Sequence, residues 1–127
     1  MSKTRRHVVS VTTASDGSAT AYSPYISGKL VSIQYVKPGS GSYTDGVDFT
    51  ITAEATGETL WTESNVNATK YCYPRAATHS TAGVAALYAA GGTGVFDHIH
   101  LGRDRVKIVL ASGGDSKVGA FHIVVED

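Results

Sequence analysis

Hydrophobic and polar residues alternate over many short stretches of this chain. The clearest stretch is VDFTITA at residues 47–53, in which every second side chain is apolar. The same period of two recurs at residues 7–12, 31–35, 106–110 and 121–126. Because successive side chains of a β-strand point to opposite sides, this pattern predicts strands with one face on a core.

Turn residues separate these stretches. They are Asp16-Gly17, Pro38 to Ser42, Asp45-Gly46, Thr56-Gly57-Glu58 and Gly113-Gly114-Asp115. Such short connections join antiparallel neighbours. We therefore predict an all-β fold of about six to eight short strands, as an antiparallel β-sandwich or a small, jelly-roll-like β-barrel.

One long segment, residues 73–94, departs from the alternation. It is rich in Ala, Gly, Thr and Ser and poor in large apolar side chains. A long Ala/Gly-rich loop in a compact domain is usually functional or disordered, so the segment is a candidate for contact with a partner. The alternative is a helix of two turns over residues 84–90, ended by Gly91-Gly92 and packed on its own domain.

The length of 127 residues fits a single domain, residues 1–127, with a core of its own. Eleven basic residues balance eleven acidic ones, which favours neither nucleic acid nor an anionic membrane as a partner. Residues 1–6 form a short basic stretch, which we expect either to be an arm that contacts a partner or simply to be solvated. The chain opens without a signal-peptide pattern, so we expect synthesis and folding in the cytoplasm.

Candidate sites for chemistry are few. His98 and His100 would share one face of a strand, but a metal site needs further ligands, which the sequence does not place. Asp45 and Asp48 could hold calcium, although a turn explains Asp45 without a ligand. The single cysteine, Cys72, excludes an intrachain disulfide and has no evident catalytic base beside it. We expect no catalytic residues, no cofactor, no metal and no small-molecule substrate.

Two further groups of residues have structural and functional interpretations. Arg103, Arg105 and Lys107 would make a basic stripe on one strand face, either solvated or facing an acidic partner. Trp61 is expected in the core. A carbohydrate-binding sandwich would instead expose a cluster drawn from Tyr22, Tyr25, Tyr35, Tyr43 and Trp61. A metal-dependent enzyme would need His98, His100 and His122 to converge.

The order of several segments resembles small virion proteins of tailed bacteriophages. The resembling segments are HVVSVTTASDGSATAYSP, ISGKLVSIQYV, TDGVDFTITAEATGETLW, NVNAT, PRAATHSTAG and RVKIVLASGGDSKVGAFHIVVED. Together they cover nearly all of the chain. No residue-level functional motif accompanies the resemblance, so it transfers no site residues.

The resemblance implies a non-enzymatic capsid decoration, or cement, protein. Such a protein binds the outside of the major capsid lattice and stabilises it, often as a homotrimer or homodimer. It would be made in the bacterial host cytoplasm and end on the capsid surface of the virion. A head-tail connector or a tail component is the alternative within the same class. The candidate partner-binding residues are Lys3, Arg5, Arg6, Tyr73, Arg75, His79, Leu87 and Tyr88.

Overall fold

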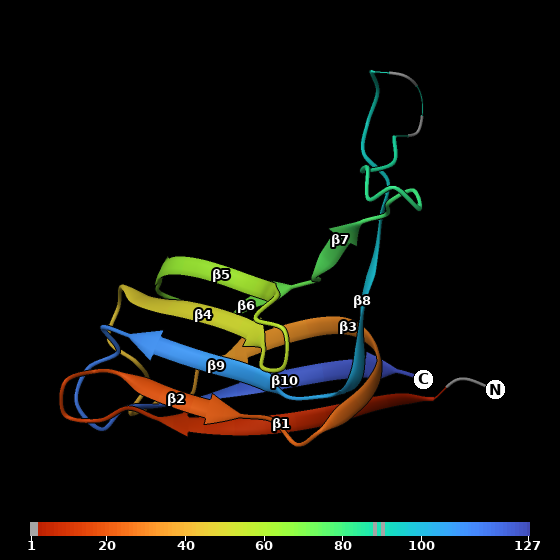
Figure 1. Cartoon of the computed structure of the whole chain (residues 1–127). Helices are drawn as coiled ribbons and strands as arrows, with labels where there is room; N and C mark the ends of the chain where they lie inside the picture. The colour runs from red at the N-terminus through yellow and green to blue at the C-terminus, as the bar shows by residue number, and fades with distance from the viewer. Residues whose placement is uncertain (1–2, 88, 90) are drawn as a thin grey trace.

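The computed structural model describes residues 3–87, 89 and 91–127, which form an all-β structure (Figure 1). The strands are β1 (Thr4–Thr12), β2 (Ala19–Tyr22), β3 (Ile26–Val36), β4 (Val47–Ala53), β5 (Thr59–Val66), β6 (Lys70–Cys72), β7 (Arg75–Ala77), β8 (Phe96–Asp104), β9 (Val106–Ala111) and β10 (Val118–Glu126). Within these ranges, the structure has no helix long and apolar enough to cross a membrane.

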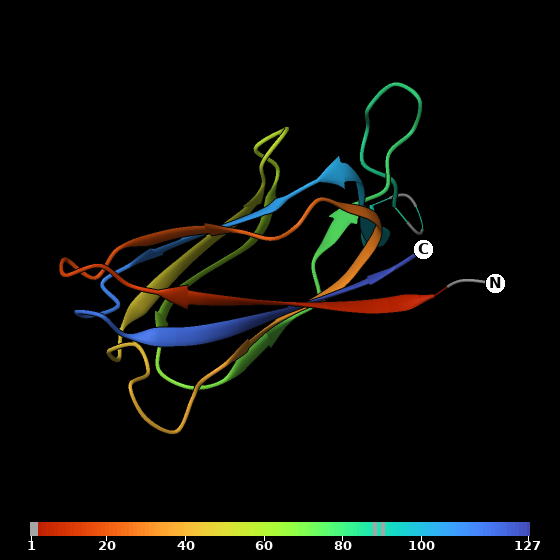
Figure 2. The ribbon, with the colours of Figure 1, turned by 90° about the horizontal axis from the view of Figure 1, so that it is seen from below.

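The strands form two antiparallel sheets that face each other (Figure 2). The large sheet has the order β1-β10-β3-β8-β7, and β6 also pairs with β3. The small sheet has the order β2-β9-β4-β5. Because the large sheet places β10 between β1 and β3, the two chain ends lie close together, and the Asp127 amide donates to the Lys3 carbonyl at 3.0 Å.

The core lies between the two sheets and follows the alternation in the sequence. In β4, Val47, Phe49, Ile51 and Ala53 are buried, whereas the polar residues between them are half-buried or exposed. Five aromatic rings pack at the centre with centroid separations of 5.0 to 5.7 Å, a range typical of favourable ring pairs. These rings belong to Tyr35, Tyr43, Phe49, Trp61 and Phe121.

Tyr43 links a loop to the core. Its ring stacks on Tyr35, and its hydroxyl donates to the Val11 carbonyl of β1 at 2.6 Å. The two tyrosine rings lie against Gly119 of β10, where a methyl group would sit 2.5 Å from Tyr43 Cε2 and 2.8 Å from Tyr35 Cε1. A side chain at position 119 would therefore displace one of the rings.

Two bulges interrupt the large sheet. Between β3 and β10, Ser32 pairs with Val124 but Leu30 pairs with Val125, so Val31 is an extra residue on β3. A second irregularity between β3 and β8 includes Arg103, whose φ of 50° lies in the left-handed region. The Val31 bulge changes which residues of β3 face the core: Leu30 and Ile33 are both buried.

The structure confirms the all-β sandwich and excludes the closed barrel among the described residues. Three expectations need correction. Thr4, Arg5 and Arg6 belong to β1 and pair with β10, so the expected arm over residues 1–6 is ordered strand from Thr4 onward. Arg103 and Lys107 lie on different strands, β8 and β9, so no single-strand basic stripe forms.

The third correction concerns residues 84–90, where we considered a short helix. The described residues of this range form no helix, and Ala85 and Leu87 instead make isolated β-bridges with His79 and Gly94. Ala and Gly allow several backbone conformations, and here hydrogen bonding to a facing chain segment overrides the helix propensity of alanine.

Candidate interaction surface

Residues 75–87, 89 and 91–98 belong to a hairpin that leaves the sandwich, and we call it the projecting hairpin. Its base is the pairing of β7 with the start of β8, from Arg75 opposite His98 to Ala77 opposite Phe96. Figure 1 shows this hairpin extending well beyond the two sheets, on the side where β8 leaves the large sheet. It corresponds closely to the Ala/Gly-rich segment that the sequence marked as a candidate for partner contact.

Backbone hydrogen bonds hold the projecting hairpin together. Thr78 donates to Val95 at 2.8 Å, Ala86 to Thr78 at 2.7 Å and Val95 to Ala86 at 3.1 Å. A tighter turn lies within it, because the Ser80 amide donates to Val84 at 2.9 Å. The hairpin is thus a defined structure and not an open coil, although it has few side chains with which to pack.

The projecting hairpin contributes almost nothing to the core. Among the described residues between Val66 and Ile99, none belongs to the cluster of buried apolar residues, and only the half-buried Cys72 and Ala76 pack against its edge. The stability of this segment therefore comes from local hydrogen bonds and from its base, since apolar burial supplies most of the favourable free energy elsewhere.

Large apolar side chains are nevertheless present on the projecting hairpin, and they face solvent. Val84 is 64% exposed, Leu87 49% and Phe96 61%, and Val95 is also exposed. Residues 76–96 contain no Asp, Glu, Lys or Arg, so no charged side chain interrupts this surface. Depletion of charge around exposed apolar side chains is typical of the centre of a protein–protein interface.

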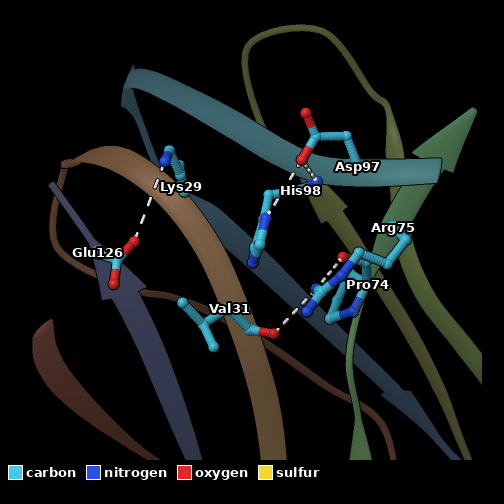
Figure 3. A network of polar contacts seen from close by, with 7 residues as sticks. All are labelled: Lys29, Val31, Pro74, Arg75, Asp97, His98 and Glu126. Atoms are coloured by element: carbon cyan, nitrogen blue, oxygen red, sulfur yellow. Dashed lines mark hydrogen bonds and ion pairs between the residues drawn. The ribbon is translucent and has the colours of Figure 1, made fainter. Parts of the chain in front are cut away.

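Arg75 anchors the base of the projecting hairpin to the large sheet (Figure 3). Its guanidinium donates to the Val31 carbonyl at 3.1 Å and to the Pro74 carbonyl at 2.7 Å. Val31 is the extra residue of the β3 bulge, and it lies between the stretch of β3 that pairs with β8 and the stretch that pairs with β6. Arg75 therefore ties the base of the hairpin to β3 and fixes where the hairpin leaves the sandwich.

Polar side chains also form hydrogen bonds on the β8 strand of the hairpin base. The Asp97 carboxylate accepts hydrogen bonds from the His98 amide at 2.7 Å and from His98 Nδ1 at 3.3 Å. These bonds, the backbone one first, lower the pKa of Asp97. Figure 3 shows the pair above β3, on the same side as Arg75. The carboxylate thus holds both the backbone and the side chain of His98 near the start of β8.

The structure does not gather these groups into a metal site. Among the described residues, no three His, Cys, Asp or Glu side chains lie together as ligands would, so His98, His100 and His122 do not converge there. The described part of the chain also encloses no ligand-sized pocket. Cys72 is half-buried, and burial raises the pKa of its thiol, with the charge of Glu63 adding to the effect.

The candidate partner-binding residues divide into two separate regions. Tyr73, His79 and Leu87 are exposed on or beside the projecting hairpin. Arg75 lies at the base of this hairpin, where it bonds the large sheet. Arg5 and Arg6 lie on β1, at the opposite edge of the large sheet, and Lys3 directly precedes that strand. Tyr88 lies outside the described residues. The predicted partner-binding residues therefore form two separate surfaces, one at each edge of the large sheet.

Sequence reasoning missed three of the four large apolar residues that face solvent on the described part of the projecting hairpin, whereas it included Leu87. Val84, Val95 and Phe96 are absent from the predicted set, yet each faces solvent. A signal was present, because the three lie in or beside the longest uncharged region of the middle of the chain. An apolar residue in a stretch with no alternation has no face on a core, and such a residue is a candidate for contact.

The aromatic cluster that a carbohydrate site would need does not form on the surface. Tyr35, Tyr43 and Trp61 are buried in the core. Tyr22 and Tyr25 are exposed, but the Arg105 guanidinium lies over both rings, 4.2 Å from one centroid and 5.1 Å from the other. These two rings are thus already covered in part by a cation–π contact.

Comparison with known proteins adds little to this description. No family model and no curated protein matches the chain. Among solved structures, the crystal structure of FLHE is similar at 11% sequence identity, over 97% of this chain and 96% of that one, with a TM-score of 0.43. A similarity of this strength indicates no function for the present chain.

Proposed function

We propose that this chain is a non-enzymatic binding protein that attaches to a larger protein assembly through its projecting hairpin. The observation that carries the proposal is the combination of Val84, Leu87 and Phe96 on a segment that lies outside the core. A solvent-exposed apolar side chain adds nothing to the stability of the fold. The same side chain gains free energy when a partner covers it.

The physical character of the projecting hairpin suits this role. Small Ala and Gly residues let its backbone approach another surface closely, and the absence of charges over residues 76–96 lowers the cost of removing water from it. Arg75 fixes the base, so the hairpin is presented in a defined direction. Preorganisation of this kind reduces the entropy lost on binding.

The assembly that we propose is the capsid of a tailed bacteriophage, with the chain as a decoration protein on the outside of the major capsid lattice. This proposal rests on the resemblance of the sequence segments to small virion proteins. A rigid sandwich with one attachment element also suits a subunit that repeats over a shell. Modest contacts at each copy become effective when neighbouring copies bind together.

The test is co-sedimentation of the purified chain with phage particles that lack it, scored as copies per particle. Hundreds of copies would support a decoration role on the shell. About a dozen copies or fewer would indicate a head-tail connector or tail location and overturn the decoration proposal. No binding would contradict the virion proposal altogether.

A further inference from the structure

Strands β1, β2, β5, β6 and β7 lie at the edges of the two sheets, and β1 differs from the other four. Strands β6 and β7 have three residues each and β2 has four, so each offers little backbone for pairing. Strand β5 shifts register against β4 at two places, which bends its edge. Short strands and irregular strands are devices that protect a sheet edge from unwanted pairing.

Strand β1 is neither short nor irregular, and its two arginines, Arg5 and Arg6, lie near its start. It pairs with β10 over nine residues, from Thr4 opposite Glu126 to Thr12 opposite Val118, without a shift of register. It contains no Pro and no Gly, and none of its residues has a positive φ. In the described part of the chain, no strand pairs with its other side. The free side of β1 is therefore a long, regular template for another strand.

The side chains of β1 alternate between the two faces of the large sheet. Val9 and Val11 are buried and face the core, so Arg6, Val8 and Ser10 lie on the outer face. Val8 is 55% exposed, more than any other valine of the described strands. A second strand beside β1 would cover this side chain.

We infer that the partner of this edge is β1 of a second copy of the chain, paired antiparallel about a two-fold axis perpendicular to the sheet. Directly opposed residues must then lie on the same face of the sheet. The register with the longest overlap sets Thr4 opposite Thr12 and centres the pair on Val8. In it, Val8 opposes Val8 of the second copy.

Charge supports this register. Arg6 opposes Ser10, and Arg5 opposes Val11, so no two cations face each other directly. Moving the centre to Arg6 would instead oppose two arginines, which is unfavourable across a strand pair. β1 is thus complementary to itself in the register of greatest overlap. The inference uses no property of the projecting hairpin and stands independently of the proposed function.

Sedimentation equilibrium of the full-length chain tests the pairing. We expect the wild type to dimerise reversibly. Val8→Lys should weaken the dimer by roughly tenfold or more in dissociation constant, because two like charges then oppose each other at the centre. Val8→Glu should do the same, and an equimolar mixture of the two variants should dimerise again. The matched control is Val36→Lys, since Val36 is an exposed valine of β3 and does not belong to an edge.

Three results would overturn the inference. They are a wild type that stays monomeric over the whole concentration range, a dimer that Val8→Lys leaves intact, and dissociation by Val36→Lys as strong as that by Val8→Lys. In the second case the dimer forms elsewhere on the chain. In the first, the β1 edge serves either an extended segment of another protein or no partner.

Discussion

The sandwich and the projecting hairpin use the same kind of strand pairing but are stabilised in different ways. In the sandwich, strands gain most of their stability from side chains such as Phe49, which is only 1% exposed. In the projecting hairpin, backbone hydrogen bonds such as Thr78 to Val95 remain, but among its described residues only Ala76 packs against the core. Backbone pairing thus gives the hairpin its shape, whereas stability must be supplied by the sandwich to which it is attached.

The difference also separates stability from binding. Core side chains of the sandwich such as Phe49 are buried and are unavailable to a partner. Leu87 and Phe96 on the projecting hairpin have the opposite property, since they are available to a partner and contribute little to the fold. Substitutions in the two regions should therefore have opposite effects on unfolding and on attachment.

The largest effect on stability is expected for Phe49→Ala. Phe49 contacts the rings of Tyr35, Trp61 and Phe121, so its loss leaves a cavity in the centre of the core. We expect the free energy of unfolding, measured by urea titration, to fall by about 3–5 kcal/mol. The matched control is Phe96→Ala on the projecting hairpin, with an expected change below about 0.5 kcal/mol. Equal losses for both would remove the distinction between the regions.

Gly119→Ala should be the next most harmful change. The added methyl group would collide with the rings of Tyr43 and Tyr35, both of which are packed in the core. Overpacking of this kind typically costs about 1–3 kcal/mol. Gly39→Ala is the control, because nothing lies within 4 Å of the corresponding methyl position. A tolerated alanine at position 119 would show that these rings are not held as tightly as described.

Tyr43→Phe should cost about 1 kcal/mol, since the Val11 carbonyl loses a hydrogen bond. The variant should also change the dependence of stability on pH. Burial, with the neighbouring Tyr35 adding to it, raises the pKa of Tyr43 above its usual value. The unfolded chain therefore loses this proton first, and stability that is complete below about pH 10 declines as the pH rises further.

Urea titrations from pH 8 to pH 11.5 would measure both effects. The wild type should lose stability at the alkaline end, and Tyr43→Phe should lose less there. Tyr71→Phe changes an exposed tyrosine and should leave stability at pH 8 unaltered. An alkaline decline of the same size in Tyr43→Phe and the wild type would mean that other groups are responsible for it.

The smallest loss of stability is expected when the projecting hairpin is shortened. Thr78 and Val95 already face each other, so an Asn-Gly turn can replace residues 79–94 between them. We expect stability to be unchanged or to rise by up to about 2 kcal/mol, because a shorter loop costs less entropy to close. A loss of more than about 2 kcal/mol would show that the hairpin supports the core.

The sequence predicted the sandwich well because alternation is a local signal. VDFTITA at residues 47–53 became β4 with the expected face buried. The strand order was beyond reach, because β10 lies between β1 and β3 and these contacts join residues far apart in the chain. The bulge at Val31 was also invisible. The alternation predicted that Val31 faces the core, but Val31 is the extra residue of the bulge and is only half-buried. Ile33 and Tyr35 face the core as expected.

The candidate surface was predicted only in outline. The unusual composition of residues 73–94 located it, yet composition does not reveal which side chains face solvent. Arg75 illustrates the limit. Its position outside the alternation suggested a contact residue, whereas its guanidinium bonds the carbonyl of Val31 in β3, a partner that the sequence does not reveal. Replacing Arg75 would thus disturb the base of the hairpin as well as any contact with a partner.

The most direct test of the central proposal is co-sedimentation with phage particles that lack the protein, using two matched double variants. Leu87→Ser with Phe96→Ser alters the projecting hairpin, and Val36→Ser with Val118→Ser removes two exposed apolar side chains from the sandwich. We expect the first pair to abolish binding with an unchanged free energy of unfolding, and the second pair to bind as the wild type does. Full binding by the hairpin variant would contradict the account, because attachment would then use another surface.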